Sequence, residues 1–230
     1  MSITYTFLGH ATHLLNVDGT KILIDPFLAG NPQATIGPDD LEVEVIVVSH
    51  GHADHIADAV SIAQRTGAKV ISNFEIVGWL GKQGVPEGQL HPQHLGGGFT
   101  HEFGYLKFTI AHHGSGLPDG SYGGNPAGLL FFLGDKRLYF ACDTALFAEM
   151  AYYGEEGLDL AVLPIGDNFT MGPADALKAV KMLTPKVAVP CHYNTWPPIE
   201  QDAQAWKTRV EAETSTKVNV LTAGEIITIA

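Results

Sequence analysis

Four metal-binding side chains fall within six residues of the segment HGHADH at positions 50–55. His50, His52, Asp54 and His55 directly follow VIVV at 45–48, an apolar, β-branched run typical of a buried strand. Neutral imidazole and carboxylate are ligands that suit Zn²⁺, Fe and Mn²⁺. A purely structural role would leave three imidazoles competing for the same few hydrogen-bond partners. The cluster therefore predicts a divalent-metal site.

The spacing within the cluster indicates two ions. Side chains two residues apart in extended backbone point the same way, so His50 and His52 can hold one ion as a pair. Asp54 and His55 lie where a helix begins, and they can reach a second ion.

Further histidines and aspartates follow other apolar strands of the chain. Asp143 comes after LYFAC, His192 after VAVPC, and His113, with its neighbour His112, after FTIA. Loops that leave one edge of an α/β protein converge on a single crevice. We expect His113 or His112 to complete the first ion, His192 to complete the second, and Asp143 to place one carboxylate oxygen on each. Asp25, which follows KILI, is expected to accept a hydrogen bond from a metal ligand.

The elements that must position these residues alternate between strands and helices. Strands are predicted at 3–9, 13–19, 21–27, 44–50, 69–73, 105–113, 129–143 (a hairpin), 159–168, 186–192 and 219–230. Helices are predicted at 54–67, 75–84, 172–185 and 199–213. Residues 85–104 are expected to form a loop or short strands, and the Gly-rich segment 114–128 either a mobile flap or an ordered series of turns. This alternation indicates a layered α/β fold, and we expect residues 1–230 to form one domain.

Composition limits the partners and the compartment. The chain has 13 Lys and Arg against 25 Asp and Glu, a net charge of -12, so a nucleic-acid partner is not expected. Neither a signal peptide nor a membrane-spanning stretch is visible, and we expect a cytoplasmic protein without a membrane partner. Cys142 and Cys191 are expected to be reduced and packed in the core. A homo-oligomer is left open.

The motifs, taken together, resemble the metallo-β-lactamase superfamily. HGHADH is similar to its signature, and LIDPF, AHH, ACDT and PCHYN follow in the superfamily's order. Nearly the full chain looks like the branch of small metal-dependent hydrolases related to ascorbate-6-phosphate lactonase, through DPFLAGNP, CDTALF, LPIGDNFTMGP and HYNTWP. The resemblance implies a four-layer αββα sandwich with the metal site at one edge of the sheets. It assigns His50, His52 and His113 to one ion and Asp54, His55 and His192 to the other, with Asp143 bridging the two. The resemblance also implies that glycine is often found where this chain has Cys142.

The resemblance and the ligand set together predict a hydrolase with two divalent ions, Zn²⁺ first, with Mn²⁺, Fe or Ni²⁺ as alternatives. Solvent held between the ions should ionise near neutrality and attack a lactone, ester or related acyl bond. Asp54 is the expected catalytic residue, carrying the proton to the leaving group. A small, anionic substrate is expected because the ions make the site locally cationic.

Three other functions are alternatives to acyl hydrolysis. A small-molecule phosphodiesterase is the second choice among enzymes, and a metal-binding domain without turnover is the alternative from another class. An oxidoreductase usually has a carboxylate in place of a histidine, and here His52 and His55 are intact. Candidate substrate contacts are His10, His94, Asn168 and Asn194, although each side chain could equally stabilise its own loop.

Overall fold

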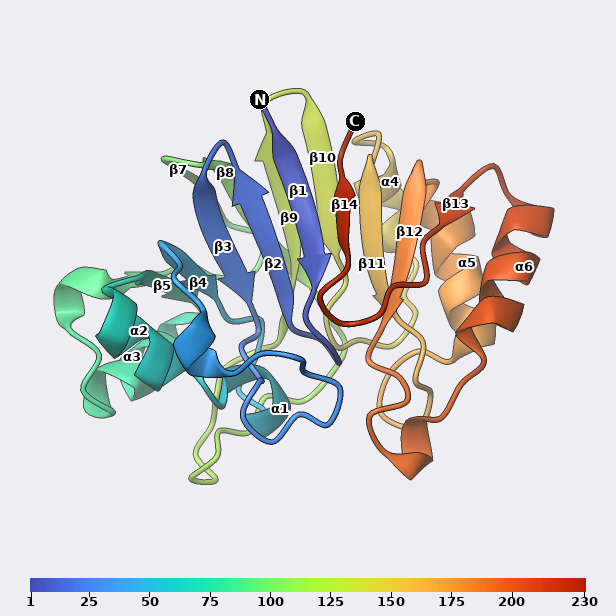
Figure 1. Cartoon of the computed structure of the whole chain (residues 1–230). Coiled ribbons are helices and arrows are strands. Elements are labelled where there is room, and N and C mark those ends of the chain that lie inside the picture. The colour runs from blue at the N-terminus through green and yellow to red at the C-terminus, as the bar shows by residue number, and fades with distance from the viewer.

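Two seven-stranded mixed sheets pack face to face in the computed structural model, which describes all residues 1–230 (Figure 1). The first sheet has the order β14-β1-β2-β3-β4-β5-β6, and the second has the order β13-β12-β11-β10-β9-β8-β7. The strands of the first sheet are β1 (Ile3–Phe7), β2 (His13–Val17), β3 (Thr20–Ile24), β4 (Val45–Val47), β5 (Lys69–Ser72), β6 (Leu90–Pro92) and β14 (Ile226–Thr228). Those of the second are β7 (Gly98–His101), β8 (Gly104–Ile110), β9 (Ala127–Leu133), β10 (Lys136–Phe140), β11 (Leu160–Pro164), β12 (Val187–Cys191) and β13 (Lys217–Val218).

Helices cover the outer face of each sheet. On the first sheet these are α2 (Ala59–Thr66) and α3 (Phe74–Lys82), and on the second α4 (Met150–Gly154), α5 (Pro173–Leu183) and α6 (Ala203–Glu213). The short α1 (Ala53–Ile56) lies below the strand ends in Figure 1. Single 3-10 turns occupy Pro38–Asp40, Glu87–Gln89 and Pro197–Ile199. No helix combines the length and the apolar composition needed to cross a bilayer.

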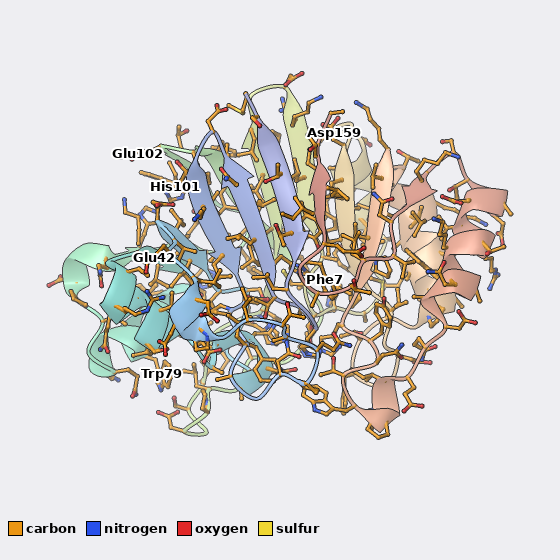
Figure 2. The ribbon with its side chains drawn as sticks, viewed as in Figure 1. Phe7, Glu42, Trp79, His101, Glu102 and Asp159 are labelled. Atoms are coloured by element: carbon orange, nitrogen blue, oxygen red, sulfur yellow. The ribbon has the colours of Figure 1, made fainter.

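Strand residues alternate between two cores, as a β-sheet with both faces covered requires. In β3, Ile22 and Ile24 point into the core between the sheets, whereas Leu23 packs under the helices. In β11, Leu160 and Val162 face the other sheet, whereas Ala161 and Leu163 face the helices. Side chains, Phe7 among them, fill the layer between the sheets (Figure 2). The architecture is the four-layer αββα sandwich that the resemblance predicted.

The predicted helix 54–67 is two helices, because the chain breaks at Ala57 and Asp58. The Asp58 carboxylate Oδ2 accepts hydrogen bonds from the backbone N–H groups of Leu28 (2.6 Å) and Ala29 (3.0 Å). The Asp58 N–H donates in turn to the carbonyl of Pro26. This break docks α1 onto the loop after β3 and separates α1, which carries the candidate ligands Asp54 and His55, from α2.

Strained backbone gathers at one edge of the sandwich. Nine residues other than glycine have positive φ, and seven of them lie in loops at this edge: His10, Asp25, Cys142, Asp167, Asn168, His192 and Asn194. Such conformations cost free energy and concentrate at functional sites. Cys142, at φ 51°, occupies a left-handed conformation that glycine adopts without strain. Both cysteines are free and buried in the core between the sheets, as predicted.

Candidate metal centre

Strands from both sheets end at this edge and deliver the candidate ligands. β4 leads to the segment 50–55, β8 leads to His113, β10 leads to Asp143, and β12 leads to His192. Asp25 follows β3 in the same way. In Figure 1 this is the lower edge of the molecule, opposite to the two chain termini.

Three histidine nitrogens converge in a first group. His50 Nε2 lies 3.0 Å from His52 Nδ1, and His113 Nε2 lies 3.2 Å from the same His52 atom. A tetrahedral zinc ion with Zn–N bonds of about 2.0–2.1 Å separates its ligand atoms by roughly 3.3–3.4 Å. The observed spacing is therefore close to that of three ligands on one ion. His112, by contrast, is exposed and packs edge-on against Phe147.

A second group contains one carboxylate and two histidines. Asp54 Oδ2 lies 3.7 Å from His55 Nε2 and 3.6 Å from His192 Nε2. His10 also approaches this carboxylate, so the atoms of all four residues lie within 4.8 Å of one another.

Asp143 lies between the two groups. Its Oδ2 atom is 3.4 Å from His113 Nε2, 3.3 Å from His55 Nε2 and 3.1 Å from His192 Nε2. His50 Nε2 is 4.0 Å away. We expected one carboxylate oxygen for each ion, but the structure brings the single atom Oδ2 to both groups.

Several buried polar atoms of these residues lack hydrogen-bond partners. His55 Nε2, Asp143 Oδ1 and both ring nitrogens of His192 are buried without one. The 3.1 Å and 3.3 Å approaches to Asp143 Oδ2 have ion-pair distances but not hydrogen-bond angles. Leaving such groups unpaired is costly, and a cation between them would give each a partner. The donor set therefore fits divalent cations.

Electrostatics favour the protonation states that metal binding needs in the first group. Burial lowers the pKa values of His50, His52 and His113, so their imidazoles are neutral ligands. For Asp143, burial alone would raise the pKa, but His192 and His55 outweigh it and hold the pKa well below its usual range.

In the second group, nearby charges outweigh the effect of burial on the pKa values. Burial opposes charge on His192, yet the negative charge of the nearby Asp143 carboxylate and the approach of Asp54 raise the pKa of His192 to about 9. Asp54 has a lowered pKa, because the hydrogen bond from His10 and the nearby imidazole of His192 outweigh the effect of burial. Two carboxylates thus gather positive charge onto the neighbouring imidazoles, which is the field that would also attract a metal ion.

A buried network fixes the orientation of two candidate ligands. Asp25 accepts hydrogen bonds from the Ser49 N–H (2.7 Å), the Ser49 hydroxyl (2.6 Å) and His55 Nδ1 (2.8 Å). Because the Ser49 hydroxyl donates to Asp25, its oxygen accepts from His50 Nδ1 at 2.9 Å. Both imidazoles therefore carry their proton on Nδ1 and turn the Nε2 lone pair toward the centre. The sequence analysis did not predict the role of Ser49 in orienting His50, although its position between the strand and His50 was a signal.

His10 is fully buried beside the second group and does not line the pocket. Its Nε2–H donates to Asp54 Oδ2 at 3.0 Å, and its Nδ1 accepts from the Thr195 hydroxyl at 2.7 Å. Burial lowers the pKa of His10 to about 4, so the ring is neutral. The structure gives His10 a role in orienting Asp54, where we expected a substrate contact, and Thr195 was not foreseen.

Of the other three candidate substrate contacts, His94 and Asn194 bond to their own loops. His94 Nδ1 accepts from the N–H of Leu95, and its side chain is half exposed. Asn194 Oδ1 accepts from the Gln201 N–H at 2.7 Å. Asn168 is exposed at φ 47°. None of the three lines the pocket at the metal centre.

The Gly-rich segment 114–128 is an ordered series of turns in this structure. The Asn73 side chain donates to the carbonyl of Gly123 at 2.7 Å, and Ser115 Oγ donates to the same carbonyl. Trp79 Nε1 donates to Asp119 Oδ2 at 2.8 Å. These bonds tie the segment to α3 and its N-terminal cap.

A pocket of about 670 Å³ opens onto both groups of candidate ligands. His52, Asp54, His113, Asp143 and His192 form its floor. The remaining lining residues are Phe27, Ala53, Ala57, Phe169, Trp196 and Pro198. No Lys or Arg lines the pocket, so the anionic substrate that we expected would find no cationic side chain there other than the histidines of the candidate metal site.

Comparison with known proteins places this fold and site in one class. The family model described as "Beta-lactamase superfamily domain" matches residues 20–193. Two UPF0173 metal-dependent hydrolases are close in sequence: one from Thermus thermophilus is 48% identical over 96% of each chain, and one from Desulforamulus reducens is 47% identical over 97% of this chain and 99% of its own. The chain belongs to the UPF0173 metal-dependent hydrolases of the metallo-β-lactamase superfamily. The solved structure of Igni18 from Ignicoccus hospitalis, described as a novel metallo hydrolase, has 37% identity and a TM-score of 0.90, covering 100% of this chain and 99% of that one.

Proposed function

We propose that this chain is a hydrolase that uses two divalent ions to cleave a lactone, ester or related acyl bond of a small molecule. The observation that carries the proposal is the position of Asp143 Oδ2, within 3.1–3.4 Å of His192 Nε2 in one group and His113 Nε2 in the other. The names of the relatives, metal-dependent hydrolase and metallo hydrolase, support the reaction class.

The seven candidate ligands would divide between two ions, and Asp143 lies near the ligands of both. His50, His52 and His113 would hold one ion, and Asp54, His55 and His192 would hold the other. Zn²⁺ suits this set of imidazole and carboxylate donors, as do Mn²⁺, Fe and Ni²⁺. When bound, such ions act as Lewis acids on a carbonyl oxygen and lower the pKa of water from 15.7 to about 7.

Asp54 is positioned to transfer a proton from water to the leaving group. Its side chain is 26% exposed and lines the pocket, whereas that of Asp143 is 3% exposed. Water adds to the carbonyl carbon, the bond from carbon to the leaving oxygen breaks, and Asp54 passes one proton from water to that leaving oxygen. The second proton leaves with the acid product to solvent. The hydrogen bond from His10 Nε2 holds Asp54 ionised and aimed for this transfer.

Turnover by the metal-loaded protein tests the proposal. A panel of lactones and aryl esters is compared with bis(p-nitrophenyl) phosphate, with the Asp54→Asn variant as the control for background hydrolysis. We expect cleavage of acyl substrates that is lost in the variant. Cleavage of the phosphodiester alone would make the chain a phosphodiesterase, and binding without any turnover would make it a metal-binding domain.

A further inference from the structure

The chemistry of the pocket divides sharply between its floor and its walls. Every polar lining residue is a candidate metal ligand, and the walls are Phe27, Ala53, Ala57, Phe169, Trp196 and Pro198. A substrate whose carbonyl lies over the floor therefore meets only apolar surface with the rest of its length. The volume, about 670 Å³, is that of a pocket for a small molecule.

No Lys or Arg lies in the chain segments that form the pocket. Four segments of the chain form the pocket: 22–64, 108–135, 138–177 and 187–206.

 Each of the four segments itself contains no Lys or Arg, and together they include every residue that lines the pocket. The net charge of the chain is -12. Away from the metal positions, an anionic group in this pocket would lose water without gaining a counter-ion, which is costly.

Trp196 and Phe27, the aromatic residues deep in the wall, are held in place by packing. The Trp196 ring lies 4.8 Å from the His10 ring and 6.1 Å from the Phe27 ring, and Phe27 lies edge-on to His10 at 5.8 Å. His10 is itself bonded to Asp54, so the wall is continuous with the floor. Phe169 is 53% exposed at the rim, which leaves its ring free to cover an apolar group.

We infer that the substrate is a neutral molecule whose acyl or alcohol part is an apolar chain or ring. The inference rests on the proposed function, because it takes the reacting carbonyl to lie over the candidate ligands. Trp196 and Phe27 bind the apolar part through burial of its surface, and Phe169 covers it at the rim.

A matched pair of esters tests the inference. p-Nitrophenyl hexanoate and mono-p-nitrophenyl adipate have acyl chains of the same length, and only the adipate ends in a carboxylate. We expect kcat/KM for the hexanoate to exceed that for the adipate by about tenfold or more, because the terminal charge finds no partner in the pocket. Equal values, or a preference for the adipate, would overturn the inference.

Variants of the wall locate the effect. Trp196→Ala should raise KM for the hexanoate severalfold while the metal content stays unchanged. Phe169→Lys should improve the adipate severalfold, and the matched control Phe169→Leu should not. An unchanged KM in Trp196→Ala, or no gain for the adipate in Phe169→Lys, would count against an apolar wall that selects neutral substrates.

A binding measurement separates this inference from the proposed function. The p-nitroanilides of the same two acids are titrated into metal-loaded protein, and quenching of tryptophan fluorescence is followed, with Trp196→Phe as the control. Tighter binding of the neutral hexanoic anilide supports the inference, and equal or tighter binding of the adipic anilide contradicts it. If neither ester is cleaved by protein that holds its metal, the proposed acyl hydrolysis fails, and this titration still decides the inference.

Discussion

Asp25 Oδ2 accepts a 2.8 Å hydrogen bond from Nδ1 of His55, and both side chains are buried. This bond fixes the imidazole proton on Nδ1, so the Nε2 atom presents its lone pair to the candidate metal centre. Asp25 also accepts two hydrogen bonds from Ser49, which in turn orients His50. A residue outside the proposed ligand set thus sets the direction of two proposed ligands.

Asp25→Asn should lower the affinity for divalent ions by about 10–100-fold, because the amide no longer holds His55 in the required orientation. Metal titration of the purified apoprotein measures the change. Asp159→Asn is the matched control: Asp159 is buried at the other end of the sheets (Figure 2), where it bonds Lys186 and the Arg137 N–H. Equal losses of affinity in both variants would contradict a specific role for Asp25.

His10→Ala should lower kcat by about tenfold or more and leave KM nearly unchanged, because Asp54 loses the hydrogen bond that aims it. Thr195→Val should have a smaller effect in the same direction, since it acts through His10. His94→Ala serves as the control and should stay within about twofold of the parent, because His94 is half exposed and lies outside the pocket. A rise in KM without a fall in kcat would argue against this positioning role.

Removal of metal should lower the melting temperature. A ligand at 100 times its Kd stabilises the folded state by about 2.7 kcal/mol, and each kcal/mol shifts Tm by about 2–4 °C in a chain of this size. We expect a fall of about 5–10 °C on chelation and recovery when Zn²⁺ is restored, measured by calorimetry. The His50→Ala variant should lose most of this response, and a full response in the variant would be inconsistent with the proposed ligands.

Stability should fall as the pH drops below 6.5. Burial lowers the pKa of His13 to about 3, and its Nδ1 accepts from the Tyr5 hydroxyl at 3.0 Å. Between pH 6.5 and 3 the unfolded chain therefore binds a proton at His13 that the folded chain does not. At pH 5 this difference destabilises the fold by about 2 kcal/mol relative to neutral pH.

The His13→Asn variant keeps an acceptor for Tyr5 and removes the titrating ring. Denaturant unfolding at pH 5 and pH 8 should show a smaller pH dependence in this variant than in the parent, by about the same 2 kcal/mol. Identical pH dependence in the two proteins would show that His13 makes no such contribution.

Much of the fold and the proposed ligand set followed from local patterns. Apolar runs such as VIVV at 45–48 predicted strands, and the polar residues directly after them predicted the edge at which His50, Asp143 and His192 meet. The structure brings these three residues together because the end of a strand fixes where the next side chain lies. The left-handed conformation of Cys142 is one that glycine adopts without strain, which fits the glycine that the resemblance implies at this position.

Interactions that join distant segments could not be read from the same patterns. The His10–Thr195 bond links residues 185 positions apart, and the break at Asp58 depends on backbone groups of the loop after β3. The prediction of an anionic substrate rested on the positive charge of the ions alone. The residues that line the pocket come from four separate segments, and only the folded chain assembles them without a Lys or Arg.

The metal-to-protein ratio tests the central claim most directly. Elemental analysis of protein saturated with Zn²⁺ and freed of excess metal is made on the parent, on Asp143→Ala and on the His94→Ala control. We predict about two ions per chain in the parent and the control and a clear loss in Asp143→Ala, since Asp143 Oδ2 contacts both groups. A parent that binds no stoichiometric metal, or an Asp143→Ala variant that keeps two ions, would contradict the account.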